Sequence, residues 1–344
     1  MTQLSTPLKA ILVGAAFVVI VAGMRAAEAI LVPFLLSVFI AVITTPFLFW
    51  LQRLRVPSMA AVLLIIGVIV ALVVGLGILI SSSLDDFLSN LPLYELRLRD
   101  ELVLVLNWLQ NFGIEISRDV ILGYFDPGKA MQLAGTTLKG VGNVLSNLFL
   151  ILLTVVFILF EASGFRAKLQ TILEDPDRSL PHFSRFSDTL KQYMVIKTLV
   201  SIVTGIVIAI WLAILGVDYP LLWGVLAFAL NYVPNIGSII AAVPAVLLAL
   251  IQIDGQTALL VAAGYVVVNL VMGNAIEPRF MGRHLGLSTL VVFLSLVFWG
   301  WVLGPVGMLL SVPLTMTVKI ALESQQDTKW MAVMLGPQKE LSDS

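Results

Sequence analysis

The stretch from Pro220 to Ile251 is apolar at both ends and is broken in the middle by Asn231-Tyr232-Val233-Pro234-Asn235-Ile236-Gly237. As helices, Pro220–Leu230 and Ser238–Ile251 would be roughly 16 Å and 21 Å long, so neither half spans a hydrocarbon core of about 30 Å. One helix over the whole stretch would be roughly 48 Å long, which is too much. A proline close to a glycine indicates a chain reversal or an unwound segment, and such backbone must be buried in protein or line a polar cavity. We therefore predict a helical hairpin that enters a membrane and has a polar tip.

A second stretch repeats this design. Leu287–Phe298 and Met308–Ile320 are apolar, and Trp299–Gly307 interrupts them. Both interruptions hold a proline shortly before a glycine, and both are followed by Val-Pro, at Val243-Pro244 and at Val312-Pro313. Paired interrupted segments point to the substrate site of a transporter. Two proline-kinked spanning helices are the alternative, because proline and glycine are frequent in membrane helices.

The composition excludes several function classes. Of the 344 residues, 59% are hydrophobic and 12% are charged, whereas a soluble domain has about 25% charged residues. The net charge of −1 argues against a nucleic-acid partner. The absence of cysteine excludes disulfides and thiolate chemistry, and His182 and His284 have no second histidine at metal-ligand spacing. The sequence has no phosphate-binding loop and no convincing catalytic constellation, so we expect neither an enzyme nor a bound metal or cofactor.

The fold class predicted is an all-α polytopic membrane protein with about six full transmembrane helices and the two hairpins. The six spans are expected at residues 8–24, 30–51, 57–83, 144–160, 193–215 and 256–274. The expected domains are three N-terminal spans (1–83), an extramembrane helical subdomain (84–140), the fourth span with a mixed-charge loop (141–192), a transport core (193–322) with hairpins at 220–251 and 287–320, and a polar tail (323–344).

Two polar segments interrupt the early spans. Arg25 and Glu28, three residues apart, are interpreted as a tight polar turn in which the two charges could pair. Residues 84–140 hold eight acidic side chains and contain an amphipathic pattern over Leu93–Phe112. Asp126-Pro127 is typical of the start of a second helix, with an N-cap followed by proline. This segment is expected to pack on the bundle or on a neighbouring subunit, or to lie at the membrane interface.

The distribution of Lys and Arg predicts the orientation. With both termini in the cytoplasm, 14 of the 20 basic residues lie inside and six lie outside. This arrangement requires the first hairpin to enter and leave on the periplasmic side, although it does not separate a re-entrant hairpin from two full crossings. The fifth and sixth spans are then each followed by a hairpin of opposite orientation. An inverted repeat whose hairpin tips meet near the midplane is typical of alternating access.

Four motifs carry a family resemblance. They are Asn231-Tyr232-Val233-Pro234-Asn235-Ile236-Gly237, Glu277-Pro278-Arg279-x-Met281-Gly282-Arg283, Leu285-Gly286-Leu287-Ser288 and Phe298-Trp299-Gly300-Trp301-x-x-Gly304-Pro305-x-Gly307. Together with the length and the span pattern, they make the whole chain resemble the AI-2E family of autoinducer-2 exporters. The resemblance implies a homopentamer in the bacterial inner membrane, surrounded by lipid, that exports the quorum-sensing signal autoinducer-2 by an elevator-like movement. Some relatives are sodium/proton antiporters, so that activity stays an alternative, and a non-transporting scaffold is a weaker one.

A site for a small polyhydroxylated solute needs hydrogen-bonding groups and one flat apolar wall. The substrate-binding candidates that could supply them are Asn231, Tyr232, Asn235, Ser238, Asn269, Trp299 and Trp301. The asparagines could instead only cap broken helix ends, or bond between helices in the case of Asn269, and the tryptophans could belong to the interfacial belt or the core.

The coupling or gating candidates are charged residues near the end of the sixth span: Glu277, Arg279 and Arg283. Glu277 is expected to pair with Arg279 or Arg283, or to carry a proton; the alternative is a structural ion pair that ends the helix. The hinge candidates are Pro234, Gly237, Gly304, Pro305 and Gly307. Gly237 and Gly307 are expected to matter for backbone shape, so that alanine is harmful there only if the native φ is positive.

The topology can be tested by cysteine labelling, since the chain has no cysteine of its own. We expect single cysteines at Asp218 and Asp254 to react with an impermeant reagent from the periplasm, and one at Arg283 to react only from the cytoplasm. Labelling at position 283 only from outside would exclude the inverted repeat.

Overall fold

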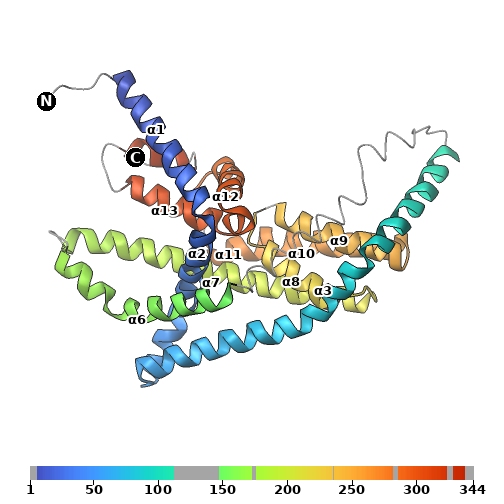
Figure 1. The fold of residues 1–344 in the computed structure, drawn as a ribbon, viewed down its shortest axis with the longest axis horizontal. Coiled ribbons are helices and arrows are strands. Elements are labelled where there is room, and N and C mark those ends of the chain that lie inside the picture. The colour runs from blue at the N-terminus through green and yellow to red at the C-terminus, as the bar shows by residue number, and fades with distance from the viewer. Residues whose placement is uncertain are drawn as a thin grey trace. The chain divides into compact units, whose positions relative to one another are not determined.

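The computed structural model of the chain describes residues 6–111, 147–172, 176–234, 236–281, 286–323 and 328–337, and every regular element among them is a helix (Figure 1). The elements are α1 (Thr6–Ala26), α2 (Glu28–Arg53), α3 (Ser58–Asn111), α6 (Leu148–Ile172), α7 (Pro176–Ile214), α8 (Pro220–Leu230), α9 (Ile236–Gln252), α10 (Gly255–Asn269), the π-helix η1 (Leu270–Ile276), α11 (Glu277–Met281), α12 (Thr289–Leu309), α13 (Ser311–Glu323) and α14 (Lys329–Leu335). Asn235, Arg283 and the helix predicted from Asp126-Pro127 lie outside the described residues.

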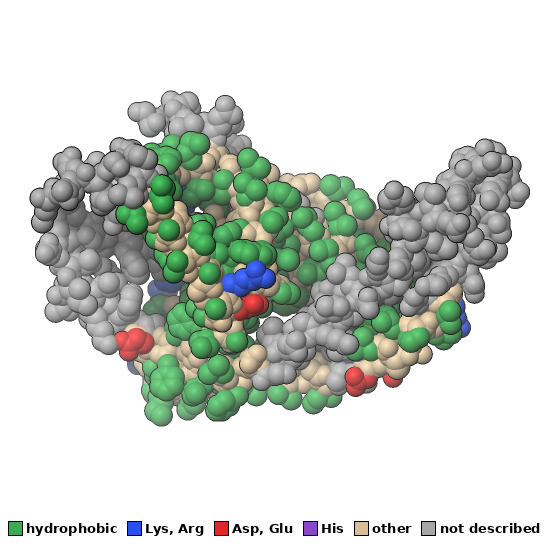
Figure 2. Space-filling view, turned by 45° about the horizontal axis from the view of Figure 1, so that its top comes forward, with side chains coloured by type: hydrophobic (Ala, Val, Ile, Leu, Met, Phe, Trp, Pro, Cys, Tyr) green, Lys and Arg blue, Asp and Glu red, His purple; other side chains and the backbone are tan. Residues whose placement is uncertain are grey.

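The chain is a polytopic α-helical membrane protein. Within the described residues, five helical segments are long and apolar enough to cross a bilayer: residues 28–53, 58–78, 188–214, 255–276 and 289–309. Four of them match predicted spans, and the fifth covers the first arm of the second hairpin together with its tip at Gly304. The predicted first and fourth spans correspond to the shorter apolar segments Ile11–Ala26 and Leu148–Glu161. Hydrophobic side chains make up most of the described surface in Figure 2, as expected for a surface that faces lipid.

The helices pack into two units. The first comprises Met1–Val62, Asn147–Lys191 and Leu285–Ser344, and the second comprises Leu63–Ser146 and Gln192–His284. Each unit therefore contains one of the two predicted hairpins. Packing thus assigns the two hairpins to different units, whereas the sequence predicted both in one transport core at residues 193–322. That transport core stays a prediction.

Helices are longer than the sequence pattern predicted. α3 is continuous from Ser58 to Asn111, so the chain does not leave the helix at the serines 81–83. α6 and α7 likewise extend into the predicted loop at residues 161–191, and α14 lies in the predicted polar tail. Serine and charged residues cost a helix only a few tenths of a kcal/mol relative to alanine, roughly, and polarity alone therefore does not end a helix.

At Arg25 and Glu28, where a tight polar turn was predicted, the structure has a bend between two helices, α1 and α2. Only Ala27 leaves the helical pattern, and the backbone bonds from Ala27 N to Gly23 O (2.9 Å) and from Leu31 N to Ala27 O (2.9 Å) continue across it. No glycine or proline lies at this point to permit a reversal. The two charges consequently lie within a bent helix and not in a loop.

In the first predicted hairpin, α8 and α9 are two antiparallel helices, while their re-entrant course in the membrane stays a prediction. At the open end, the side chain of Gln252 accepts a hydrogen bond from the backbone N–H of Asp218 at 3.0 Å. At the tip, Gly237 packs on Leu230, and a Cβ at Gly237 would lie 1.9 Å from the Leu230 carbonyl oxygen. The two arms therefore contact each other both at the open end and at the tip of the hairpin.

The second hairpin, α12 and α13, closes in the same way. At its open end, the Lys319 ammonium donates to the Gly286 carbonyl oxygen at 2.5 Å. At its tip, a Cβ at Gly307 would lie 2.0 Å from the Trp299 carbonyl oxygen. The predicted interruption covered the nine residues Trp299–Gly307. In the structure, Gly304 has non-helical backbone angles, with φ of 63° and ψ of −153°, and interrupts the helix there. This backbone region is accessible almost only to glycine.

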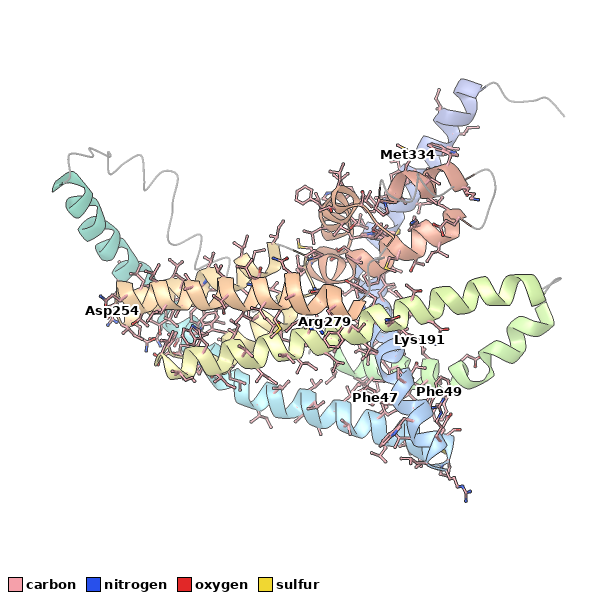
Figure 3. The ribbon with its side chains drawn as sticks, turned by 180° about the vertical axis from the view of Figure 1, so that it is seen from behind. Phe47, Phe49, Lys191, Asp254, Arg279 and Met334 are labelled. Atoms are coloured by element: carbon pink, nitrogen blue, oxygen red, sulfur yellow. The ribbon has the colours of Figure 1, made fainter. Side chains whose placement is uncertain are left out.

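Unit 2 is organised around α9 and α10. The small residues Ala241, Ala245 and Ala249 are buried along one side of α9 and allow close packing. Asp254 caps α10, because its Oδ1 accepts from the Thr257 N–H at 2.7 Å, and this bond holds the pKa of the carboxyl below its ordinary value. In Figure 3, Asp254 and Arg279 lie at opposite ends of the α10–η1–α11 rod. The 22 residues Gly255–Ile276 are about 33 Å long as an α-helix, enough to separate the two faces of a bilayer.

The tip glycines provide a test of this packing. Neither Gly237 nor Gly307 has a positive φ; among the described glycines, positive values occur at Gly216, Gly286 and Gly304. The condition under which alanine was predicted to be harmful is therefore not met at either glycine, and the close approach to a backbone carbonyl gives a different reason to expect harm. We expect Gly237→Ala and Gly307→Ala each to destabilise the protein by about 1–3 kcal/mol or more, since backbone must shift to admit the methyl group.

Gly23→Ala and Gly67→Ala are matched controls, because a Cβ at either glycine meets nothing within 4 Å. Both should keep or raise the midpoint of thermal unfolding of the purified protein in detergent, as alanine is the better helix former. Equal midpoints for all four variants would contradict the packing described at the two tips.

Candidate functional site

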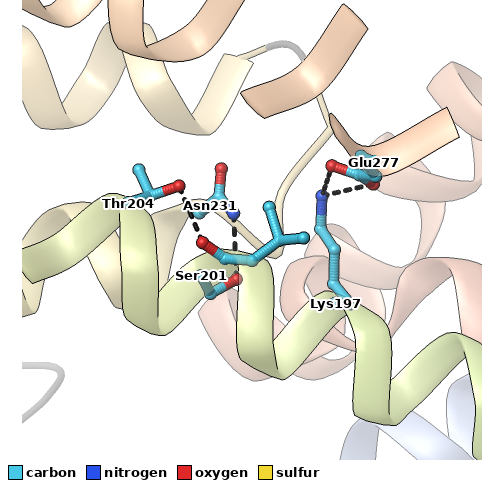
Figure 4. A network of polar contacts seen from close by, with 6 residues as sticks. Lys197, Ser201, Thr204, Asn231 and Glu277 are labelled. Atoms are coloured by element: carbon cyan, nitrogen blue, oxygen red, sulfur yellow. Dashed lines mark hydrogen bonds and ion pairs between the residues drawn. The ribbon is translucent and has the colours of Figure 1, made fainter. Parts of the chain in front are cut away.

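The tip of the first hairpin is bound to α7 by two side-chain hydrogen bonds. The Asn231 amide Nδ2 donates to the Ser201 hydroxyl at 2.9 Å (Figure 4). The Tyr232 hydroxyl donates to the Thr198 hydroxyl oxygen at 2.7 Å. Tyr232 is buried and Asn231 is half-buried. The tip is therefore polar, as predicted, and its polar groups face another helix of the same unit.

Two glycines position this contact. A Cβ at Gly205 would lie 2.7 Å from the Gly224 carbonyl oxygen, and a Cβ at Gly224 would lie 2.7 Å from that of Gly205. α7 and α8 thus approach closely and in opposite directions. Because the two helices are antiparallel, Asn231, which follows Gly224 on α8, lies beside Ser201, which precedes Gly205 on α7. The hairpin tip therefore lies next to the hydroxyl groups of α7.

One turn away on α7, Lys197 forms an ion pair with Glu277. Its Nζ lies 2.8 Å from both carboxylate oxygens. The Lys197 side chain is 6% exposed and that of Glu277 is 19% exposed. Glu277 is the first residue after the π-helix η1, and π-helical turns in proteins are frequent at functional sites.

This pair corrects one prediction. Glu277 was expected to pair with Arg279 or Arg283 or to carry a proton; among the described residues, the partner of its carboxylate is instead Lys197, 80 residues earlier in the chain. The other two alternatives, Arg283 and the proton, stay predictions. Arg279 is exposed, and Arg283 lies outside the described residues. Two residues apart on a helix, Glu277 and Arg279 point to different sides, so only the tertiary structure could supply the partner.

Sequence reasoning missed the α7 side of this site. The polar residues Lys197, Thr198, Ser201 and Thr204 lie at helical spacing in an otherwise apolar span, and Ser201 and Thr204 are 0% and 3% exposed. Their spacing of three and four residues was the available signal, because such residues share a helix face. We call Lys197, Thr198, Ser201, Asn231, Tyr232 and Glu277 the tip-1 site.

The remaining candidates of the first hairpin and the sixth span are Asn269, Ser238 and Pro234. The Asn269 amide donates to the Tyr265 carbonyl oxygen of its own helix at 2.8 Å. Ser238 is half-buried in the first turn of α9. Pro234 lies in the non-helical tip, where its carbonyl oxygen accepts from the Ile236 N–H at 2.6 Å. A direct contact of Asn269 or Ser238 with solute stays a prediction.

The two tryptophans of the second hairpin differ. Trp299 is buried and its indole N–H donates to the Thr315 hydroxyl at 2.9 Å, so it joins the two arms of the hairpin. Trp301 is 56% exposed, and the Arg25 guanidinium carbon lies 4.6 Å from its ring centroid. Trp301 could therefore provide the expected flat wall for a solute. Trp299 could not, because its ring is buried inside the hairpin.

The charges of the bent helix contact the second tip. While Arg25 covers Trp301, the Glu28 carboxylate lies 3.0 Å from the position that a Cβ at Gly304 would take. The expected pairing of Arg25 with Glu28 is thus replaced by contacts of both residues with the hairpin. Of the other hinge candidates there, Pro305 is exposed and Gly307 is buried.

Comparison with known proteins identifies the family. The sequence model of the AI-2E family transporter matches residues 15–326. The chain belongs to the AI-2E transporter family. It is 46% identical to the "AI-2 transport protein TqsA" of Escherichia coli strain K12, over 95% of each chain. It is 42% identical to a "putative transport protein" of Haemophilus influenzae over 94% of each chain. It is 38% identical to the "putative transport protein YhhT" of E. coli K12, over 94% of this chain and 93% of that one. Both the family and the names of these relatives are those of transport proteins.

The Arg25–Trp301 contact of this AI-2E transporter can be measured. A cation over an exposed ring contributes about 0.5–1 kcal/mol. We expect Trp301→Leu to lower stability by this amount and Trp301→Phe, which keeps an aromatic face, to retain most of it. The measurement is a double-mutant cycle with Arg25→Met, read by unfolding of the purified protein.

Trp330→Leu serves as the control, because Trp330 is a similarly exposed tryptophan (64%) on α14. It should show no coupling to Arg25→Met. A coupling of zero between Trp301→Leu and Arg25→Met would show that the contact contributes nothing to stability.

Proposed function

We propose that this chain exports autoinducer-2, or a closely similar small polar metabolite, across the bacterial inner membrane by alternating access. The family and the name of the 46% identical relative support the substrate class. The single observation that carries the proposal from the chain itself is the bonding of the first hairpin tip to α7 through Asn231–Ser201 and Tyr232–Thr198.

These two bonds suit a step in which a solute replaces a contact within the protein. A neutral hydrogen bond contributes only about 0.5–1.5 kcal/mol net, because water or another partner can replace it. The hydroxyls of a polyhydroxylated solute can offer Asn231 and Ser201 the same partners that they offer each other. Solute binding and tip release can therefore exchange hydrogen bonds at little cost in free energy.

The proposal keeps the expected architecture. Each packing unit contains one of the two predicted hairpins, and interrupted helices of this kind form the substrate sites of many transporters. The inverted repeat, the re-entrant course of the hairpins, the elevator-like movement, the cytoplasmic termini and the homopentamer remain parts of this proposal. Each subunit then acts as its own transporter.

A sodium/proton antiporter is the second candidate function, and the observation that favours it is the Glu277 carboxylate at the end of an apolar span. Intramembrane carboxylates commonly bind coupling ions. A non-transporting scaffold is disfavoured, since two polar-tipped breaks in apolar helices cost stability without serving it.

The deciding experiment is transport by the purified protein in liposomes. We expect efflux of entrapped autoinducer-2 above that of protein-free liposomes, and no collapse of an imposed pH gradient on addition of sodium. Sodium-driven collapse of the gradient without autoinducer-2 efflux would favour the antiporter, and neither activity would leave the scaffold.

A variant separates solute binding from architecture. Asn231→Ala should lower autoinducer-2 flux per folded molecule by about fivefold, the effect of roughly 1 kcal/mol for one lost hydrogen bond. Asn235→Ala should also lower flux if that asparagine contacts the solute. If the asparagines are only helix caps, each substitution should cost about 1 kcal/mol of stability and leave flux unchanged.

Asn90→Ala is the matched control, because the Asn90 amide bonds only the Asp86 carbonyl oxygen of its own helix, at 2.9 Å. It should change neither flux nor melting temperature appreciably. Equal loss of flux in Asn90→Ala and Asn231→Ala would remove the tip-1 site from the proposal.

A further inference from the structure

The tip-1 site contains one charge of each sign, with Lys197 buried and Glu277 partly buried. Lys197 holds Glu277 by both carboxylate oxygens at 2.8 Å, and both side chains are largely removed from solvent. We propose that Lys197 determines the charge class of the solute: by neutralising Glu277 inside the site, it makes the site select a neutral, hydroxyl-rich solute over a cation. This inference rests on the proposed function, since it assigns specificity to the same site.

The geometry argues that the pair is closed to ions. A buried carboxylate without a partner is costly, and it recruits a proton, a metal cation or a basic side chain. Here the basic side chain comes from α7 and contacts both oxygens, so the carboxylate presents no uncompensated charge. A sodium ion would have to displace the ammonium group, whereas a neutral solute would not.

Among the described residues, the hydrogen-bonding groups of Ser201 and Asn231 beside the pair are uncharged. Ser201 lies one turn from Lys197 on the same face of α7, and its oxygen accepts from Asn231. This bond leaves the Ser201 hydroxyl proton and the Asn231 carbonyl oxygen as one donor and one acceptor. In Figure 4 the Asn231 carbonyl oxygen points away from Ser201 and α7. One donor beside one acceptor matches the hydroxyl groups of a polyol.

Removal of the lysine charge should therefore change the class of ligand. Lys197→Met keeps the length of the side chain but leaves the Glu277 carboxylate without its partner. The site should then bind a small cation such as sodium. The double variant Lys197→Met/Glu277→Gln restores neutrality and should lose that sodium binding.

The test measures thermal unfolding of the purified protein in detergent, in sodium chloride and in choline chloride at equal ionic strength and mildly alkaline pH. A ligand that binds the folded state raises the melting temperature. We expect a sodium-specific rise of at least about 2 °C for Lys197→Met, and none for the unsubstituted protein or the double variant.

Lys191→Met is the matched control. Lys191 lies on the same helix, and its pair with Asp188 is looser, at 3.7 Å, and more exposed. It should show no sodium-specific rise. A rise in the unsubstituted protein would overturn the inference, because the pair would then admit cations; absence of a rise in folded Lys197→Met would overturn it as well.

If Lys197→Met does not fold, Glu277→Gln tests the same idea with the opposite sign. The uncompensated ammonium should then bind a small anion, so that chloride raises the melting temperature relative to gluconate. No chloride effect in folded Glu277→Gln overturns the inference.

These readouts do not depend on transport. If liposomes show no autoinducer-2 efflux while the sodium pattern is as expected, the named substrate fails and the selection of a neutral solute stands. If efflux is found and the sodium pattern is absent, the transport function stands and the assignment to Lys197 fails.

Discussion

A helix that is interrupted inside an apolar segment frees backbone groups that lipid cannot bind, and the rest of this structure follows from that constraint. Both hairpins meet it by turning the chain back on itself within a few residues. In each, a glycine at the start of the returning arm packs on a carbonyl at the end of the first arm, Gly237 on Leu230 and Gly307 on Trp299. The approach leaves no room for a Cβ, so backbone closes each tip, and tip side chains such as Asn231 and Trp299 bond to other helices.

The two tips are held by different chemistry. The first tip is bound to α7 by neutral hydrogen bonds, with a charge pair one turn away. The second tip is contacted by the charged residues of a bent helix, Arg25 over Trp301 and Glu28 beside Gly304. The neutral bonds can be exchanged for those of a hydroxyl-bearing solute, whereas a cation over an exposed ring is a weak contact that positions the hairpin. This difference is the reason why we propose the first tip, and not the second, as the solute site.

In our proposal, the Lys197–Glu277 ion pair decides which class of solute the tip-1 site can serve. A carboxylate at the end of a membrane span ordinarily indicates ion coupling. This residue type is the reason why a sodium/proton antiporter was considered. With Lys197 on both oxygens, the same carboxylate becomes one half of a neutral unit that joins α7 to the end of the sixth span. A buried pair of this kind contributes little net stability compared with apolar packing, which is consistent with a role in the site and not only in the fold.

The sequence by itself determined the class of protein, the family and the position of both hairpins, because apolar length and the placement of proline and glycine act locally along the chain. It also identified Asn231, Tyr232 and Glu277 as polar groups in apolar surroundings. The sequence did not predict the ends of α3, α6 and α7 or the bend at Ala27. A helix tolerates polar residues, so polarity does not mark its end, and packing decides where the helix ends. The partners of the site were decided by tertiary structure alone. Lys197 is 80 residues from Glu277, and Ser201 is 30 residues from Asn231; these contacts depend on how closely Gly205 and Gly224 let α7 and α8 approach, a distance that no local pattern encodes.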